Sequence, residues 1–272
     1  MLKRLMNKVI ILIERVTRTK ISIKRTKIRD TSKLPKYSSS YLSRIVDIME
    51  RVTNINPQNV FEIGANYGQD AEFLKTRFNL EDSAIFVFEP HPEIFAEMKK
   101  KYSFNCYPNA ISDKNEKVIF HAVSLKSKNS GISSLMKHKY NGNDDYFETE
   151  VESLRMDKFI AQNNVNEIDF LKIDVEGGSY EVLCGFGRDL DRVKAIQIES
   201  EYAPVWIGQK TWDEIYNLLM NNDFQLIHFE LQEDGIQSDS FWINNKFVKH
   251  QIYNISTGRW HEESHNITKN SY

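Results

Sequence analysis

Apolar residues gather along the chain in short, mostly apolar runs, and amphipathic segments separate one run from the next. The runs are residues 60–63, 84–88, 104–107, 168–173, 193–198, 224–229 and 240–244. The segments with apolar side chains at helical spacing are residues 41–53, 70–77, 93–102, 179–184 and 212–221. Short, mostly apolar runs without strict alternation are typical of strands buried on both faces. Their alternation with helices predicts an α/β fold whose parallel sheet is covered by helices on both faces.

Residues 116–156 interrupt this alternation. Within them, residues 117–123 and 150–154 have the pattern of strands, and the stretch between is polar and rich in Ser, Lys, Asn and Asp. Connections of this length inside a compact domain are often lids. We therefore predict a lid-like insertion at about residues 124–149.

The first thirty residues are strongly basic, with ten Lys or Arg residues against Glu14 and Asp30. Their apolar residues recur at helical spacing, which predicts a basic amphipathic helix. Such a helix packs on its own domain, pairs with a second subunit or lies on an anionic membrane surface, and the sequence leaves these alternatives open. We assign residues 1–40 to this extension and its linker, residues 41–250 to the main domain and residues 251–272 to a tail.

The composition narrows the classes of protein. A chain of 272 residues with 40% hydrophobic side chains suffices for one generous domain. The formal net charge of −2 offers no basic field for nucleic acid. Cys106 and Cys184 are too few for a disulfide framework and indicate a reducing compartment. With no secretory signal, we expect a cytoplasmic protein, and peripheral contact with the inner face of the membrane through residues 1–30 stays an alternative.

Acidic residues stand where the predicted strands end. Glu62, Glu89, Asp174 and Glu199 occupy such positions. In doubly wound sheets the ligand binds outside the carboxyl ends of the strands, where the strand order reverses. Core packing does not require acids at these positions. The recurrence therefore predicts that this edge of the sheet holds a functional site.

The loop after the first strand reads Gly64-Ala65-Asn66-Tyr67-Gly68. Its glycines allow a tight turn and close approach to a ligand. Asn66 stands where a dinucleotide-binding fingerprint has its middle glycine, and no third glycine follows. Glu89 is placed to accept hydrogen bonds from both ribose hydroxyls of a nucleoside. Together the loop and this acid predict nucleoside binding, and the departure from the fingerprint favours S-adenosyl-L-methionine over a nicotinamide cofactor.

Three segments carry a closer resemblance: VFEIGANYG at residues 60–68, FEPHP at 88–92 and FLKIDVEG at 170–177. They resemble the signature blocks of the FkbM family of methyltransferases. Residues 109–113, 133–135 and 198–199, with Gly208 and Gln209, are similar to its weaker blocks. The likeness runs from about residue 58 to about residue 245. Its one departure is Glu62, where the family more often has Asp.

This resemblance implies a class I methyltransferase fold. That fold is Rossmann-like and doubly wound, with a mostly parallel seven-stranded sheet and helices on both faces. In this chain it would follow the basic helical extension. The resemblance also implies O-methylation, often of a sugar hydroxyl in glycans or natural products.

The resemblance further implies roles for individual residues. Gly64, Ala65, Asn66 and Gly68 would wrap the methionine end of the cofactor, with Glu62 beneath it. Glu89 would hold the ribose. The residues after the third strand that would line the adenine are Ala110, Ser112 and Asp113. Asp174 and Glu176 would lie beside the sulfonium and the incoming hydroxyl.

Methyl transfer to a hydroxyl requires an aligned nucleophile and a group that removes its proton. The candidates for this group are Asp174, Glu176, Glu199, Glu201 and His228. An acid in a partly desolvated site has a raised pKa and is a stronger base. His228 lies inside a predicted strand and is equally well explained as a core histidine. Two or three of the acids are alternatively ligands for Mg²⁺, although no residue is assigned as a metal ligand.

The acceptor remains open at this stage. Tyr202, Trp206 and Trp212 follow the fifth strand, where aromatic rings stack on sugars but equally often pack in a core. Basic residues within 126–139 suit a phosphorylated or nucleotide-linked acceptor or a solvated loop. The leading hypothesis is an O-methyltransferase that acts on a saccharide, as a glycan or a nucleotide-linked sugar. The alternatives are a methyltransferase for a non-sugar metabolite or a peptide, and a catalytically silent docking module.

Overall fold

The computed structural model describes residues 41–125, 130–139, 146–232, 235–248, 251–254 and 259–262. The chain divides into two units, Met1–Ser38 and Ser39–Tyr272, and all described residues belong to the second. The predicted basic extension at 1–40 lies outside the described residues. So do parts of the predicted insertion and of the predicted tail.

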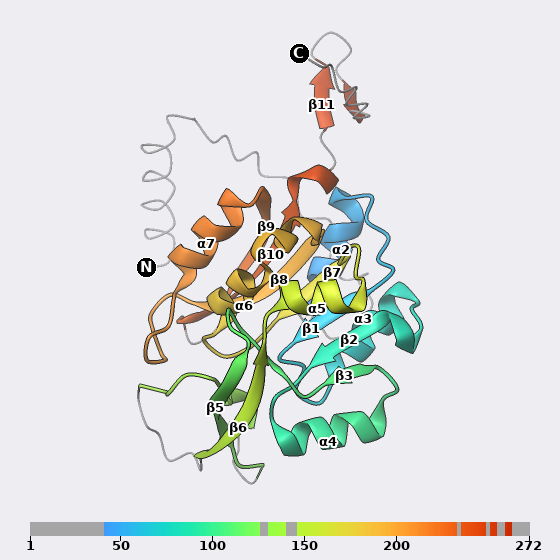
Figure 1. Ribbon diagram of the computed structural model, residues 1–272. Helices are drawn as coiled ribbons and strands as arrows, with labels where there is room; N and C mark the ends of the chain where they lie inside the picture. The colour runs from blue at the N-terminus through green and yellow to red at the C-terminus, as the bar shows by residue number, and fades with distance from the viewer. Residues whose placement is uncertain are drawn as a thin grey trace, which may run out of the picture. The chain divides into compact units, whose positions relative to one another are not determined.

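The main sheet has seven strands in the order β3-β2-β1-β7-β8-β10-β9 (Figure 1). Their bounds are β1 Val60–Ile63, β2 Ile85–Phe88, β3 Asn105–Tyr107, β7 Phe170–Ile173, β8 Ala195–Glu201, β9 Phe224–Leu231 and β10 Gln237–Asn244. β10 runs antiparallel to both of its neighbours, and all other neighbouring pairs are parallel. The predicted doubly wound, mostly parallel fold is therefore confirmed. Its strand order reverses at β1 and β7, where ligands bind in such sheets.

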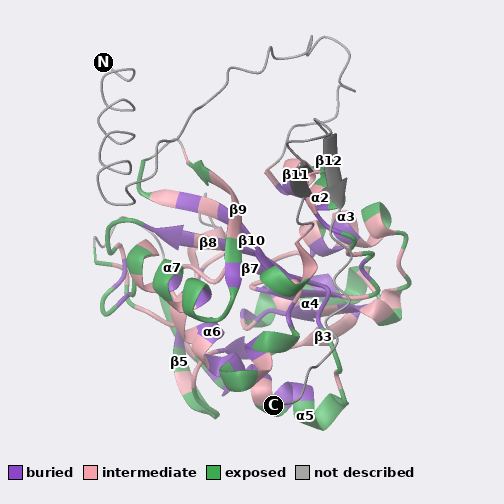
Figure 2. Cartoon of the chain, turned by 90° about the horizontal axis from the view of Figure 1, so that it is seen from above, coloured by how far each residue is buried: buried purple, intermediate pink, exposed green. Residues whose placement is uncertain are grey.

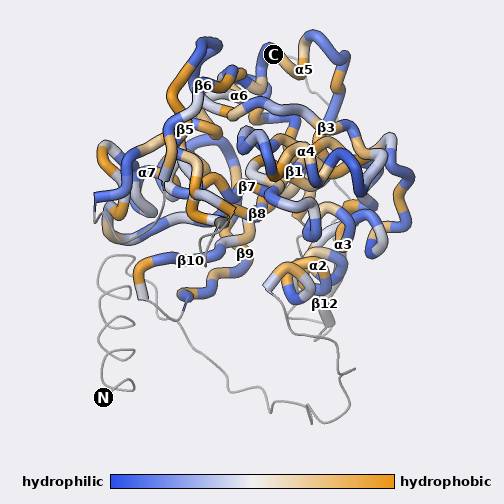
Figure 3. Tube along the Cα trace, turned by 90° about the horizontal axis from the view of Figure 1, so that it is seen from below, coloured by the Kyte–Doolittle hydropathy of each residue, from blue (hydrophilic) through white to orange (hydrophobic). Residues whose placement is uncertain are grey.

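Three helices cover each face of this sheet. Their bounds are α5 Met156–Asn163, α6 Ser179–Phe186 and α7 Trp212–Asn221 on one face, and α2 Tyr41–Val52, α3 Gln69–Phe78 and α4 Pro92–Lys101 on the other. Successive strand residues point to opposite faces, so Phe61 packs against α5 while Val60 belongs to the core beneath α2 and α3. The sheet is accordingly buried along its middle (Figure 2) and hydrophobic there (Figure 3). Burial on both faces explains why the strands read as mostly apolar runs.

A second, smaller sheet has the order β4-β6-β5. Its strands are β4 Ala110–Ile111, β5 Glu116–Val123 and β6 Tyr146–Leu154. β6 begins four residues before the predicted start at residue 150, because its ladder with β5 extends to the pair Val123 and Tyr146. The outer half of β6 is solvated and carries alternating acids, which hides it from a search for apolar runs.

Two further findings adjust the sequence-based elements. β8 continues past its predicted end, since Glu199, Ser200 and Glu201 pair with β10. Glu199 therefore lies within a strand. In the predicted tail, β11 Gln251–Asn254 pairs antiparallel with β12 Arg259–Glu262. Short 3₁₀ turns complete the described elements at Asp82–Ala84, Ser130–Ile132, Gly187–Arg192 and Asn245–Phe247. None of the helices in the described ranges is both long and apolar enough to cross a membrane.

Candidate active site

A pocket opens at the carboxyl ends of β1, β2, β7 and β8, where the strand order reverses. The polar residues that line it are Asn66, Glu89, Asn109, Ser133, Asp174, Glu176, Glu199, Gln232 and Gln237. Its apolar walls include Phe88, Ile111, Phe120 and Leu135. The small sheet contributes to this lining, so the insertion between β3 and α5 forms one side of the pocket.

The cofactor loop predicted after β1 is a tight turn built on backbone contacts. Gly64 has a φ of +82°, and a Cβ there would lie 1.8 Å from the carbonyl oxygen of Asp174. The N–H groups of Gly64 and Ala65 both donate to the carbonyl of Phe88, at 3.0 and 3.1 Å. Position 64 therefore requires glycine, because the ends of β1 and β7 touch there without room for a side chain.

Asn66 follows in the left-handed region, with a φ of +48°. Asparagine adopts this conformation more readily than most residues. Its Oδ1 atom is buried and has no hydrogen-bond partner within the protein. Buried polar atoms are nearly always paired, and Asn66 lines the pocket. The orphaned oxygen is therefore a fixed acceptor available to a ligand that carries a donor.

Glu89 lies at the end of β2, and 6% of its surface is exposed. Its two carboxylate oxygens accept from the N–H groups of Asn66 and His91, each at 2.8 Å. Burial raises the pKa of Glu89 to about 7, although these two hydrogen bonds oppose the shift. The same carboxylate thus fixes the cofactor loop and forms part of the pocket wall.

Lys172 is a buried cation beneath the pocket. Its Nζ atom lies 2.9 Å from Asp174, 3.2 Å from Asp70 and 3.3 Å from Glu62. Glu62 also accepts from the N–H of Ala71 at 2.9 Å, in the first turn of α3. Lys172 therefore ties β1, α3 and the end of β7 together through charge-assisted contacts.

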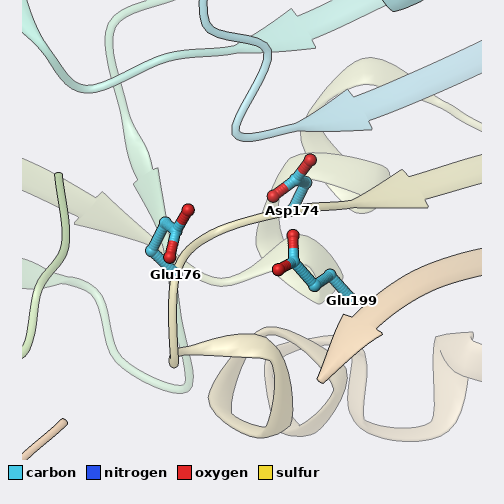
Figure 4. Close-up of side chains that lie close together, drawn as sticks. All are labelled: Asp174, Glu176 and Glu199. Carbon is cyan, nitrogen blue, oxygen red and sulfur yellow. The ribbon is translucent and has the colours of Figure 1, made fainter. Parts of the chain in front are cut away.

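Asp174, Glu176 and Glu199, which all line the pocket, lie close together (Figure 4). One carboxylate oxygen from each lies within 4.8 Å of the others. Burial alone would raise the pKa of Asp174, but Lys172 and a hydrogen bond with Glu199 outweigh it and lower that pKa. Burial and the charge of Asp174 raise the pKa of Glu199 far above its ordinary value. The pair therefore shares one proton, which Glu199 carries.

Glu176 stands across from this pair on the loop after β7 (Figure 4). Its φ of +52° is unusual for a residue with a side chain. Ser134 secures the loop, because its hydroxyl donates to the Glu176 carbonyl at 2.6 Å. Burial, followed by the charges of Asp174 and Glu201, raises the pKa of Glu176 well above its ordinary value. The strained backbone and its hydrogen bond hold this third acid in the pocket wall.

Trp206 packs against the loop after β7, which carries Glu176. A Cβ at Gly177 would lie 2.3 Å from its ring, so the indole packs directly on the glycine backbone. The indole N–H and the amide of Gln209 donate to the buried carboxylate of Glu201. His138 packs edge-on against Trp206, with ring centroids 4.9 Å apart. Trp206 is therefore a packing residue, and Tyr202, 44% exposed, is the more accessible of the predicted aromatic residues.

Several predicted site residues do not line the pocket. The lining excludes Glu62, Ala65, Gly68, Ser112, Asp113, Glu201 and His228. Glu62 lies outside the lining and pairs with Lys172 at 3.3 Å. The ring of His228 stacks on Tyr41 of α2 at 5.6 Å, so the structure separates it from the three acids. Ala110 lines the pocket, whereas Ser112 bonds to Asp113 at 3.2 Å just beyond it.

Three residues in the pocket lining or next to it had no role assigned from the sequence. Lys172 was detectable, because a lysine inside a four-residue apolar strand requires a buried anionic partner. Gln232 follows the end of β9, Gln237 is the first residue of β10, and neither carries a motif. Only the return of β10 alongside β8 brings them to the pocket.

A metal ion fits this arrangement less well than a shared proton does. Three carboxylates are a ligand set that Mg²⁺ uses, and these three are the candidate cation group found among the described residues. However, Asp174 is already paired with the ammonium of Lys172 and hydrogen bonded to Glu199. Lys172 thus already compensates part of the negative charge that would hold a divalent cation.

Comparison with known proteins assigns the family. The sequence model of the methyltransferase FkbM domain matches residues 62–226, more than half of the chain. The chain belongs to the FkbM methyltransferase family. It is 26% identical over 197 residues to the 2-O-methyltransferase NoeI of Sinorhizobium fredii, and the match covers 68% of this chain and 77% of that protein. The resemblance inferred from the three signature blocks is confirmed, and so is the class of enzyme.

Solved structures also match this chain, at low identity. An FkbM methyltransferase of Methylobacillus flagellatus is 13% identical with a TM-score of 0.47, covering 69% of this chain and 44% of its own. The chain thus spans less than half of that protein. Magnesium protoporphyrin IX methyltransferase of Synechocystis, solved with bound SAM, is 10% identical with a TM-score of 0.42, covering 76% of this chain and 77% of its own.

Proposed function

We propose that this protein transfers the methyl group of S-adenosyl-L-methionine to a hydroxyl of a saccharide. The observation that carries the proposal is the meeting of two kinds of group in one pocket. The first group is Asn66 and Glu89, and the second is the acids Asp174, Glu176 and Glu199. The name of the Sinorhizobium relative, a 2-O-methyltransferase, supports a hydroxyl as the acceptor.

The residues of the first group, Asn66 and Glu89, fit the cofactor. The orphaned Oδ1 of Asn66 offers an acceptor for its amino group. Each oxygen of Glu89 accepts one backbone N–H and keeps a lone pair for a ribose hydroxyl. The adenine would lie against Asn109, Ala110 and Ile111, which line the pocket after β3. Ser112 and Asp113, expected there from the resemblance, would act from behind this wall.

The acids of the second group supply the functional groups that methyl transfer requires. The bound cofactor provides a methyl group on a positively charged sulfur, which is a good leaving centre. Asp174, kept ionised by Lys172, offers the compensating negative charge on this side of the pocket. Glu199 holds Asp174 in place through their shared proton. Glu176 is then the acid available to accept the proton of the acceptor hydroxyl.

Burial strengthens Glu176 for this task. A carboxylate whose pKa is raised binds a proton more strongly than an exposed one, so it is the better base once it is ionised. Its backbone, constrained by Ser134 and by the packing of Trp206 on Gly177, limits the positions that the carboxylate can take. Fixed placement of the base relative to the hydroxyl is a large part of catalysis in such a displacement.

Calorimetry with S-adenosylhomocysteine, followed by transfer of a labelled methyl group to a panel of saccharides, tests the proposal. We expect binding and a mass increase of one methyl group on a sugar. A folded protein that binds neither S-adenosylmethionine nor S-adenosylhomocysteine would overturn it. Methyl transfer to a metabolite or peptide instead of a sugar would change the proposed class of acceptor. Cofactor binding without any methyl transfer would favour the catalytically silent docking module.

A further inference from the structure

The turn between β9 and β10 forms a part of the pocket to which the proposed function gives no role. Gln232 follows the end of β9 and Gln237 begins β10, and the backbone N–H of Gln232 donates to the carbonyl of Gln237 at 2.9 Å. Both residues line the pocket. The match with the family model ends at residue 226, before this turn. Membership of the family therefore assigns these two residues no function.

The side-chain amide of Gln232 is held in one orientation. Its nitrogen donates to Oδ2 of Asp239 at 3.1 Å, and Oδ1 of Asp239 accepts from Gln197 at 2.9 Å. Burial raises the pKa of Asp239 to about 6, so its carboxyl is mostly ionised at neutral pH and only accepts hydrogen bonds. The nitrogen of Gln232 must therefore face Asp239. Its Oε1 atom is left as a hydrogen-bond acceptor for a ligand.

The strand order places Gln232 away from the cofactor residues. Asn66 follows β1 and Glu89 follows β2, whereas β7, β8 and β10 lie between β1 and β9. Asp239 is paired directly with Glu199 in the ladder of β8 and β10, and side chains of such pairs are close neighbours. Gln232, bonded to Asp239, therefore approaches the pocket next to Glu199, on the side where the methyl acceptor would bind.

We propose that Gln232 selects the acceptor by accepting a hydrogen bond from a hydroxyl on the carbon next to the one that is methylated. The acceptor is then a vicinal diol of a saccharide ring, with the reacting hydroxyl among the three acids and its neighbour at Gln232. This inference rests on the proposed function and names the group that the site recognises. A fixed amide oxygen that loses its donor costs binding free energy, so a ring without the neighbouring hydroxyl is a poor acceptor.

The same contact limits the enzyme to one methyl group per diol. Once a hydroxyl is methylated, its oxygen carries no proton and cannot donate to Oε1 of Gln232. A product that returned with its two positions exchanged would place this ether against the amide oxygen. We therefore expect monomethylated products.

Deoxy analogues of the acceptor test the role of Gln232. Methyl glycosides of several hexoses and deoxyhexoses are assayed for labelled methyl transfer, and the methylated position is located by mass spectrometry. For the glycoside that reacts fastest, the analogues that lack each neighbouring hydroxyl are compared with the parent. We expect kcat/KM of one analogue to be lower by roughly tenfold or more in the unaltered enzyme. In Q232M the parent should fall toward the level of that analogue, and the analogue should change little.

Two measurements separate this inference from the proposed function. Q225M makes the same substitution at an exposed position of β9 and should leave the ratio of parent to analogue unaltered. S-adenosylhomocysteine should bind Q232M as tightly as the unaltered protein, because Gln232 lies on the acceptor side.

A ratio near one in the unaltered enzyme, or an equally large ratio in Q232M, overturns the role of Gln232 and leaves the proposed function standing. Weaker binding of S-adenosylhomocysteine by folded Q232M does the same, since it would place Gln232 at the cofactor. If the protein binds S-adenosylhomocysteine but methylates no saccharide, the proposed function is overturned, and this inference with it.

Discussion

The ammonium of Lys172 lies 2.9 Å from Oδ2 of Asp174, inside a ring of three carboxylates. Removing one partner of a buried ion pair leaves an uncompensated charge and typically costs about 3–5 kcal/mol. We expect K172M to lose about this much free energy of unfolding in a denaturant titration. The double variant K172M/E62Q, which removes one of the stranded carboxylates, should recover part of it. Equal stability of K172M and the unaltered protein would contradict the ion-pair network.

Glu89 should contribute to cofactor affinity through its charge. Hydrogen bonds to a charged group are worth about 1.5–3 kcal/mol, so E89Q should bind S-adenosylhomocysteine roughly 10- to 150-fold more weakly. Calorimetry measures this change directly. E93Q, at an exposed position on α4, is the matched control. If a folded E89Q binds S-adenosylhomocysteine as tightly as the unaltered protein does, Glu89 does not bind the ribose.

Glu176 and Glu199 should respond differently to the same substitution. Loss of a general base lowers turnover by roughly 10²–10⁴, and we expect this of E176Q. In E199Q the amide still donates a hydrogen bond to Asp174, as the protonated carboxyl does. Its turnover should therefore fall much less. The measurement is kcat at saturating acceptor, with cofactor affinity as the check that the pocket is intact. The reverse order of effects would assign the base to Glu199.

The buried acids predict that stability falls as the pH rises. Burial is the first cause that raises the pKa of Glu89 and Glu201 to about 7 and that of Asp239 to about 6. The ordinary values are about 4. Between these limits the folded protein retains protons that the unfolded chain releases, so the free energy of unfolding decreases with increasing pH. Melting temperatures at pH 5, 6, 7 and 8 should decline in that order.

The variant E201Q removes one of these titrations and should flatten the decline. Its slope is compared with that of E148Q, in which an exposed acid of β6 is changed. Melting temperatures that rise from pH 5 to pH 8 would mean that these carboxyls are ionised in the folded protein.

A chelator should leave methyl transfer unchanged. Lys172 already compensates Asp174, and a shared proton joins Asp174 to Glu199. Turnover is measured with the chelator EDTA and again with added Mg²⁺. A loss with EDTA that Mg²⁺ restores would reassign Asp174, Glu176 and Glu199 as ligands of a catalytic ion.

The sequence predicts the fold well where burial is complete. β1 and β7 are buried along their whole length, and their apolar runs mark them directly. β6 was found only from residue 150 onward, because its first four residues, Tyr146–Thr149, are exposed or half-buried and lack a buried apolar pattern. A local sequence pattern identifies a strand only where all residues of the strand have a similar degree of burial.

The candidate site was predictable where a motif ends a strand. The loop at Gly64, the acid Glu89 and the acids after β7 fall into this class. His228 was misleading, since a histidine in a strand does not reveal which face it occupies, and its ring stacks on Tyr41. Gln232 and Gln237 could not be foreseen, because they reach the pocket through the pairing of β10 with β8.

The contact between Gly64 and the Asp174 carbonyl distinguishes pocket residues that are mechanically coupled from residues that can be varied in protein engineering. A side chain at position 64 would collide with the strand that carries the acids, so neither the cofactor loop nor the acid loop can be redesigned without the other. Ser133, Leu135, Gln232 and Gln237 belong to segments outside this contact. Libraries that seek a new acceptor should therefore vary these four positions and leave the β1 and β7 loops untouched.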